Sequence, residues 1–282
     1  MKNYETRDIL RPVFIVGLPR SGTTVFYRTL ARHPHFAWIS PATRKLTRWY
    51  WPCRMQRLFR NHRLPVEAPR VWRKGRRAEN DALLGRDVTP PLRRYYRKIV
   101  ESQMRLADAP RFLSKHPRNG LRIPFFMEIF PEATFLHVIR DGRAVAESIL
   151  RYRRRAGSEH RWWGMKPPGW EQMASLSPCE QIGWQWAECV RRIRADGRRL
   201  PSGRYHEVRY ETFCEQPETT LHAVAESCRL DDPGSVWSHV TGLTSQNSKW
   251  REALSARQIA ETEKQAGPVL AELGYAPSSC LP

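Results

Sequence analysis

The segment PVFIVGLPRSGTT at residues 12–24 determines the fold that the sequence predicts. Its first five residues are an unbroken apolar run, which is typical of a strand buried on both faces of a parallel sheet. A turn from Gly17 to Gly22 follows, and a helix is predicted from Thr23 to about Arg32, where His33-Pro34 ends it. Successive backbone N–H groups in such a turn, together with the positive end of the helix, form a cradle for phosphate oxygens.

The spacing Gly17-x4-Gly22 is that of a P-loop, but Thr23 stands where a P-loop has its lysine. Kinases and nucleoside triphosphatases use that lysine, with Mg²⁺, to neutralise the β- and γ-phosphates. Arg20 is the cation that remains inside this loop. The loop therefore predicts a bound nucleotide that is not a triphosphate, and a P-loop kinase acting on a small molecule is the alternative.

The rest of the chain alternates between short apolar runs and helical patterns. Further strands are predicted at 35–39, 111–115, 134–139 and 205–210, and helices at 92–107, 121–130, 142–152 and 180–199, with more helices up to the C-terminus. This alternation predicts an α/β fold, a three-layer α/β/α arrangement around a mostly parallel sheet. We expect one domain over residues 1–282, with a basic, aromatic-rich insert at about 44–90.

The composition is that of a globular, strongly basic protein. The 282 residues include 48 Lys and Arg, of which 40 are Arg, against 28 Asp and Glu, which gives a net charge of +20. This excess predicts an anionic partner, although GC-rich codons could produce it too. No run is long and apolar enough for a transmembrane helix, the N-terminal residues given are polar and lack the apolar core of a signal peptide, and the six cysteines show no disulfide or zinc spacing. We therefore expect a cytoplasmic protein whose cysteines serve packing.

A second phosphate site is predicted in the segment TFLHVIRDGRAVAES at residues 134–148. Arg140 follows a predicted strand, and ligands of open α/β sheets bind at such strand ends. Ser148 lies on the helix that comes next. A phosphate dianion favours a forked guanidinium and a hydroxyl donor, so this pair is suited to hold one.

Taken together, these motifs resemble those of sulfotransferases that use 3′-phosphoadenosine 5′-phosphosulfate (PAPS). PRSGTT at 19–24 resembles their 5′-phosphosulfate loop, and 130–148 is similar to their 3′-phosphate motif. VRYE at 208–211, where the Tyr lies near the adenine, and SKW at 248–250 are similar to further signatures, the latter of the protein-tyrosine branch. The resemblance implies transfer of a sulfuryl group from PAPS to a hydroxyl, without a metal. It also implies the nucleotide-binding residues Pro19, Arg20, Ser21, Gly22, Thr23, Thr24, Arg140, Ser148, Tyr210, Ser248 and Lys249.

The same resemblance implies which residues perform the transfer. In the family a basic residue of the loop and a second lysine neutralise the leaving group, and here these are Arg20 and Lys115. The general base is open between His116, Glu79 and Asp81. The tyrosine branch has a glutamate shortly after its His-Pro dipeptide, but no acid follows His33-Pro34 up to residue 42. We therefore expect a small-molecule, carbohydrate or lipid acceptor.

Two segments are candidates for acceptor contacts. Residues 44–77 hold 12 Lys and Arg but one acid, Glu67, among several aromatic residues. This basic block has three interpretations: a solvated cap, a lid for an anionic acceptor, or an interfacial element in peripheral contact with anionic membrane. The tryptophan-rich loop at 160–178 either lines the acceptor pocket or packs on the surface. A non-enzymatic protein that binds nucleic acid or membrane would leave both phosphate motifs unexplained.

Overall fold

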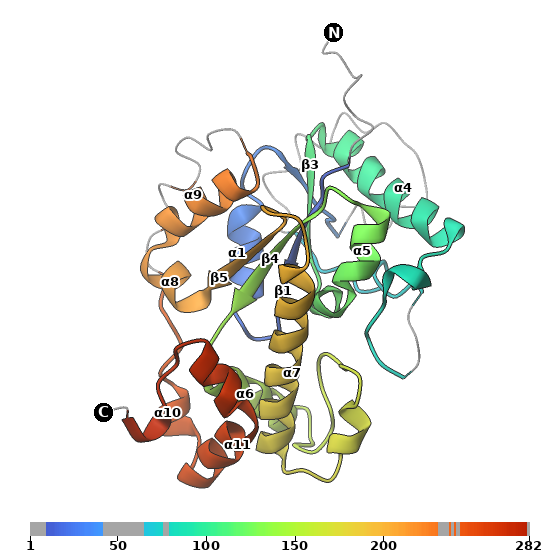
Figure 1. Ribbon diagram of the computed structural model, residues 1–282. Coiled ribbons are helices and arrows are strands. Elements are labelled where there is room, and N and C mark those ends of the chain that lie inside the picture. The colour runs from blue at the N-terminus through green and yellow to red at the C-terminus, as the bar shows by residue number, and fades with distance from the viewer. Residues whose placement is uncertain are drawn as a thin grey trace.

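The computed structural model describes residues 10–41, 65–75, 79–230, 237, 240 and 243–280. Its centre is a five-stranded sheet with the order β2-β3-β1-β4-β5, and every pair of neighbours is parallel (Figure 1). The strands are β1 (Val13–Val16), β2 (Phe36–Ala37), β3 (Arg111–Lys115), β4 (Thr134–Ile139) and β5 (Tyr205–Arg209). After β1 the chain forms β2 and then β3 on one side of β1, and it then crosses to β4 on the other side. The carboxyl ends of β1, β3 and β4 therefore meet at a topological switch point, where α/β sheets bind ligands.

Alternate residues of β1 belong to different hydrophobic cores. Phe14 and Val16 face a core that includes α4 (Pro90–Ala107), α5 (Ile123–Ile129), α6 (Gly142–Arg155), α7 (Pro178–Arg198) and α11 (Ala256–Glu272). Val13 and Ile15 face a second core with α1 (Thr23–Leu30), α8 (Tyr210–Glu215) and α9 (Pro217–Ser227). Figure 1 shows α1, α8 and α9 on one side of the sheet and α4, α5 and α7 on the other, with α6 and α11 below the sheet in this view. The predicted three-layer α/β/α fold class is thereby confirmed.

The element bounds agree with the sequence prediction except where proline or an edge position intervenes. β3 and β4 have the predicted bounds, whereas β2 is only two residues long. β2 lies at the sheet edge and follows Pro34, which has no N–H to donate to a ladder. The helix predicted at 121–130 begins at Ile123, after a 3₁₀ segment at Pro117–Arg122. Pro124 cannot donate a hydrogen bond to the preceding turn, so the regular helix starts anew there.

The remaining elements are α10 (Trp250–Ala253) and short 3₁₀ turns at Gly85–Asp87, Trp170–Met173 and Ser278–Cys280. The five described cysteines are unpaired, and four of them are buried.

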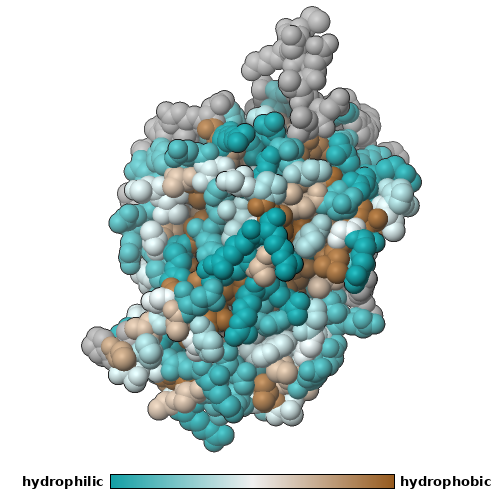
Figure 2. Space-filling view, viewed as in Figure 1, coloured by the Kyte–Doolittle hydropathy of each residue, from teal (hydrophilic) through white to brown (hydrophobic). Residues whose placement is uncertain are grey.

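Most of the basic block, residues 44–64 and 76–77, lies outside the described residues, so its three interpretations stay predictions. No helix in the described ranges combines the length and apolarity that crossing a membrane requires. Hydrophilic side chains predominate on the face seen in Figure 2.

Candidate active site

The phosphate loop connects the end of β1 to the first turn of α1, and its two glycines are required by their surroundings. Gly17 has φ +137°, and a Cβ there would lie 2.5 Å from the Val138 carbonyl oxygen of β4. Gly22 has φ +84°, and a Cβ there would lie 2.2 Å from the ring of Tyr210. The first amides of α1 have no acceptor within the helix, and no side chain caps them. The loop therefore presents backbone donors at a helix N-terminus, which suits an anion.

The two predicted phosphate motifs meet at Arg20. The Nε atom of Arg20 donates a hydrogen bond of 2.8 Å to Oγ of Ser148, on α6. Nη1 of Arg140 donates one of 3.0 Å to the carbonyl oxygen of Arg20. Arg140 is buried, and its guanidinium carbon lies 4.5 Å from the centroid of the Tyr210 ring. The structure thus brings together four side chains that the sequence predicted for nucleotide binding.

The segment before α10 also reaches Arg140, through residues that the sequence did not single out. Nε of Arg140 donates to Oδ1 of Asn247 at 3.2 Å, and Nη2 donates to the carbonyl of Gln246. Ser248 and Asn247 line a cavity of about 360 Å³, while Lys249 is exposed. Only proximity to the SKW motif could have indicated Gln246 and Asn247.

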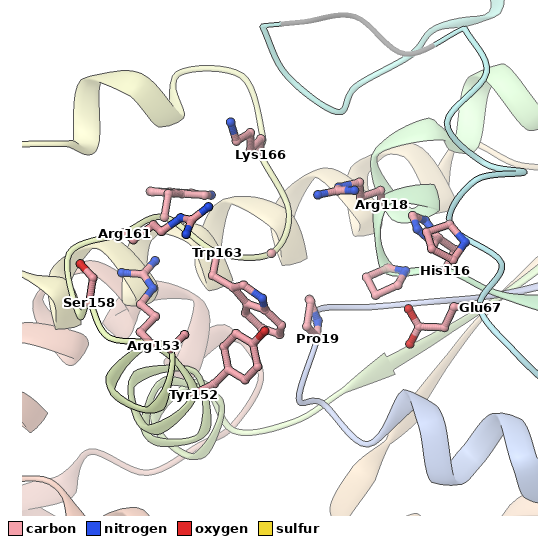
Figure 3. A pocket seen from close by; sticks show the side chains of 15 residues that line it. Pro19, Glu67, His116, Arg118, Tyr152, Arg153, Ser158, Arg161, Trp163 and Lys166 are labelled. Atoms are coloured by element: carbon pink, nitrogen blue, oxygen red, sulfur yellow. The ribbon is translucent and has the colours of Figure 1, made fainter.

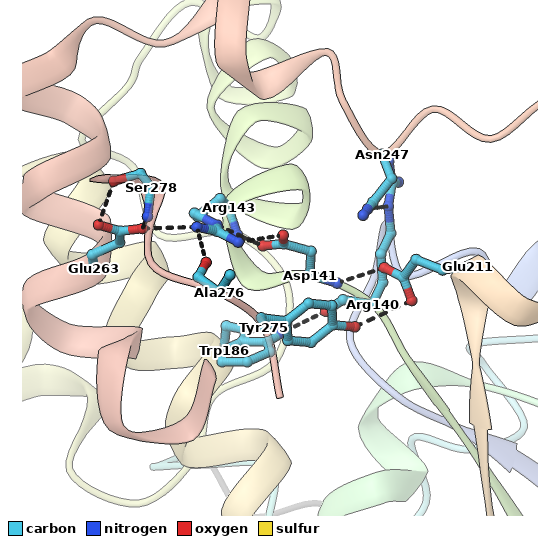
Figure 4. A network of polar contacts seen from close by, with 10 residues as sticks. All are labelled: Arg140, Asp141, Arg143, Trp186, Glu211, Asn247, Glu263, Tyr275, Ala276 and Ser278. Atoms are coloured by element: carbon cyan, nitrogen blue, oxygen red, sulfur yellow. Dashed lines mark hydrogen bonds and ion pairs between the residues drawn. The ribbon is translucent and has the colours of Figure 1, made fainter. Parts of the chain in front are cut away.

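A network of polar contacts fixes the backbone around Arg140 (Figure 4). Nη2 and Nε of Arg143 both donate to the carboxylate of Asp141, at 2.8 and 3.0 Å. Nη1 of Arg143 donates to Glu263, and the amide of Asp141 donates to Glu211 at 3.0 Å. Tyr275 also donates to Glu211. These contacts join the start of α6 to α8, α11 and the C-terminal segment, so Arg140 projects from a rigid frame.

Lys115 stands at the end of β3, beside the loop. Its side chain is 2% exposed, and its Nζ atom donates to Oγ1 of Thr24 at 2.9 Å and pairs with Glu67. Burial lowers the pKa of Lys115, and the charge of Glu67 acts against that shift. A buried ammonium therefore touches both the phosphate loop and a carboxylate.

Glu67 is a residue whose role sequence reasoning missed. Its side chain is 43% exposed, and it lines the cavity next to Pro19 and His116. One signal was available, because Glu67 is the single acid among the 12 cations of residues 44–77. A lone carboxylate therefore stands out against the charge of the residues around it.

The cavity in which Glu67 lies has a volume of about 440 Å³ (Figure 3). One end is formed by Pro19, Glu67, His116 and the neighbouring Pro69, Pro117 and Arg118. The other end is formed by the C-terminal turn of α6 and the tryptophan-rich loop, from Tyr152 to Lys166. The loop predicted as a candidate for acceptor contacts thus lines the same cavity as Pro19 of the phosphate loop.

The three predicted bases differ in access to this cavity. His116 lines it, but Nδ1 of His116 is enclosed and has no hydrogen-bond partner among the described residues. Burial and the adjacent Arg122 hold the pKa of His116 well below its usual value, so its ring is neutral. Asp81 is fully buried and accepts hydrogen bonds from Arg118 and from the Lys166 amide, so it cannot reach an acceptor. Glu79 is exposed and lies outside the cavity lining.

Comparison with known proteins establishes the family to which the chain belongs. A profile described as "Sulfotransferase family" matches residues 12–234. The chain belongs to the sulfotransferase family. Omega-hydroxy-beta-dihydromenaquinone-9 sulfotransferase Stf3 of Mycobacterium bovis is 21% identical over 300 residues, covering 94% of this chain and 75% of that protein. The protein-tyrosine sulfotransferase of Drosophila melanogaster is 28% identical over 138 residues, covering 49% of this chain and 25% of that protein.

A solved structure shows the same fold. Sulfotransferase STF9 from Mycobacterium avium superposes with a TM-score of 0.61 at 15% identity, covering 94% of this chain and 77% of that one. The resemblance inferred from the motifs is confirmed, and the kinase and binding-protein alternatives are set aside. The protein is a PAPS-dependent sulfotransferase.

Proposed function

We propose that this sulfotransferase binds PAPS between the phosphate loop and Arg140 and transfers its sulfuryl group to a hydroxyl in the Figure 3 cavity. We call Arg20, Arg140 and Ser148 with their surroundings the phosphate end, and Lys115 with Glu67 the transfer end. The residues present suit the nucleotide, because guanidinium groups, a hydroxyl and helix N-terminal amides are the donors that phosphate and sulfate oxygens accept. PAPS supplies the activated sulfuryl group when it is bound.

Lys115 and Glu67 have complementary tasks at the transfer end. The Lys115 ammonium, fixed against Thr24, neutralises negative charge that grows on the leaving phosphate oxygen. Arg20 serves the same purpose from within the loop. Glu67 accepts the proton of the acceptor hydroxyl, because it is the carboxylate that lines the cavity. His116 is the second candidate base, since it lines the cavity with a neutral ring.

The observation that carries this proposal is the position of Lys115. One buried ammonium contacts the loop that holds the nucleotide and the carboxylate that faces the acceptor. In-line transfer requires the acceptor oxygen, the sulfur and the leaving oxygen in one row. Lys115 lies between the proposed nucleotide site and the acceptor cavity, where these three atoms must line up.

The acceptor is proposed to be a small molecule, a carbohydrate or a lipid. A cavity of about 440 Å³ lies within the range of about 300–1,000 Å³ usual for small-ligand sites. One relative is named for a hydroxylated dihydromenaquinone, and others are named for protein tyrosine. The chain lacks the acid after His33-Pro34 that the tyrosine branch has, which favours a non-protein acceptor.

The proposed nucleotide site is tested by thermal-shift titration with 3′,5′-ADP, 5′-AMP and Mg-ATP. Ligand binding to the native state adds about 2.7 kcal/mol of stability at a hundredfold excess over Kd. We expect a shift with 3′,5′-ADP, without Mg²⁺, that 5′-AMP fails to match. Equal shifts with 3′,5′-ADP and 5′-AMP would show that Arg140 and Ser148 do not hold a 3′-phosphate.

A further inference from the structure

The end of the cavity farthest from Glu67 holds a buried arginine that the proposed reaction leaves unused. Arg153, in the last turn of α6, is 1% exposed. Nη1 of Arg153 donates to the carbonyl oxygen of Glu159 and to Oε1 of Gln181, at 3.2 and 3.1 Å. Its Nε and Nη2 atoms are enclosed and have no partner in the described part of the chain. A buried charged group with unsatisfied donors is costly unless a ligand supplies the acceptors.

No described carboxylate neutralises Arg153. Glu159, the acid nearest to it along the chain, forms an ion pair with Arg154 instead. Burial lowers the pKa of Arg153 to about 10, which still leaves it charged at neutral pH. Its guanidinium carbon lies 5.9 Å from the ring centroid of Trp162, so an aromatic face is among its neighbours. The charge therefore lacks an anionic partner within the described residues.

Two further cations line the same cavity. Arg161 is exposed, and Figure 3 draws it at the same end as Arg153. The Nζ atom of Lys166 lies 3.8 Å from the centroid of the Trp170 ring. Neither forms an ion pair with a described residue. Arg118 differs, because Asp81 neutralises it at 3.0 Å.

The charges of the cavity are thus separated along its length. Glu67 is the single carboxylate among the described lining residues, and it lies at the transfer end (Figure 3). The cations that have no ion pair within the described ranges lie across the cavity from it (Figure 3). On the side of that end nearer Pro19, the rings of Tyr152 and Trp163 pack with centroids 4.4 Å apart and offer a wall for a flat or sugar-like body (Figure 3).

We infer that the acceptor is itself an anion: a small hydroxyl compound with a carboxylate, sulfate or phosphate group that Arg153 and Arg161 receive while its hydroxyl faces Glu67. This inference rests on the proposed function, because it takes the cavity as the acceptor site. The forked guanidinium groups match the paired oxygens of such anions. The separation also fixes the direction of binding, because an anionic group at the Glu67 end would meet a like charge.

The test measures binding by calorimetry with the enzyme saturated by 3′,5′-ADP, which fills the phosphate end. Three pairs of probes differ only in the anionic group: 4-hydroxyphenylacetate and its amide, glucose 6-phosphate and glucose, and 12-hydroxydodecanoate and its methyl ester. In at least one pair, we expect the anionic compound to bind at least ten times more tightly than its neutral counterpart.

Arg161→Gln should reduce this preference for the anionic compound to threefold or less, and Arg153→Gln should do the same. Arg155→Gln should keep it, because Arg155 is exposed on the same helix and does not line the cavity.

The outcomes separate this inference from the proposed function. Equal binding within every pair, no binding of any anion, or a preference that survives Arg161→Gln would overturn the inference. Because Arg153 is buried, the Arg153→Gln result is used only if the circular dichroism spectrum of that variant matches that of the wild type. If it does not match, the Arg161→Gln result alone tests the inference. Failure of 3′,5′-ADP itself to bind would overturn the proposed function as well. Binding of 3′,5′-ADP without an anion preference would overturn the inference alone.

Discussion

The phosphate end and the end of the acceptor cavity that holds Arg153 and Arg161, here called the basic end, both depend on arginine, but they use it in opposite ways. At the phosphate end, Arg140 donates to three protein oxygens and is supported by the network around Asp141 and Arg143. At the basic end, two nitrogens of Arg153 have no hydrogen-bond partner among the described residues, and Arg161 has no ion pair among them. At the phosphate end, the protein's own oxygens hold the arginine in place. At the basic end, the arginines have room for an anionic group, which a substrate can supply. A shared nucleotide site and a variable acceptor site are expected to differ in this way.

The largest effect is expected at the transfer end, where a single ammonium contacts both the phosphate loop and the carboxylate of the acceptor cavity. Lys115→Met should lower the rate of sulfuryl transfer on the order of a hundred- to a thousandfold, as loss of one charge-stabilising donor does elsewhere. Its affinity for 3′,5′-ADP should change little, because the phosphate end is intact. The measurement is single-turnover transfer from PAPS to a screened hydroxyl acceptor, or to water. Lys98→Met, at an exposed position of α4, should transfer at the wild-type rate.

The next effect is expected at the phosphate end itself. Arg140→Gln should lower the affinity for 3′,5′-ADP by roughly ten- to a hundredfold, because a hydrogen bond to a charged group contributes about 1.5–3 kcal/mol. Calorimetric titration of 3′,5′-ADP gives the affinity. Arg155→Gln provides a matched loss of charge at the end of α6 and should leave that affinity unchanged. Wild-type affinity in Arg140→Gln would remove the 3′-phosphate role from Arg140.

A smaller effect is expected on the free energy of unfolding from the loop glycine that packs against Tyr210. Gly22→Ala places a Cβ 2.2 Å from that ring at a φ of +84°. Gly157→Ala has a similar φ of +86° but no heavy atom within 4 Å, so it reports the backbone strain alone. We expect Gly157→Ala to cost about 1–2 kcal/mol and Gly22→Ala more. Urea unfolding measures both, and equal losses would mean that the loop does not need this close contact.

The smallest effect is a pKa shift that links the two members of the transfer end. Burial lowers the pKa of Lys115, and the Glu67 charge opposes that shift. Glu67→Gln removes the opposing charge, so Lys115 should lose its proton at a lower pH than in the wild type. The chain has eight lysines, which makes a titration followed by NMR of ¹³Cε-labelled lysine practical. An unchanged Lys115 titration in Glu67→Gln would show that the two groups do not interact in solution.

Much of this architecture could be predicted because it depends on local sequence. The strand–loop–helix at residues 12–24 and the strand that ends before Arg140 follow from apolar runs and glycine spacing. Glu67 and Arg153 were missed because their roles depend on contacts across 48 and 28 residues, which no local pattern encodes. Asp81 was a reasonable candidate base by type, but its burial between Arg118 and the Lys166 amide makes it structural.

The most direct test of the account compares Glu67→Gln with Glu79→Gln in single-turnover sulfuryl transfer, with 3′,5′-ADP affinity measured alongside. General base catalysis contributes about 10²- to 10⁴-fold, so Glu67→Gln should lose at least a hundredfold in rate while it binds 3′,5′-ADP as the wild type does. Glu79→Gln should transfer at the wild-type rate, because Glu79 lies outside the cavity. Wild-type transfer by Glu67→Gln would contradict the account and leave His116 as the base.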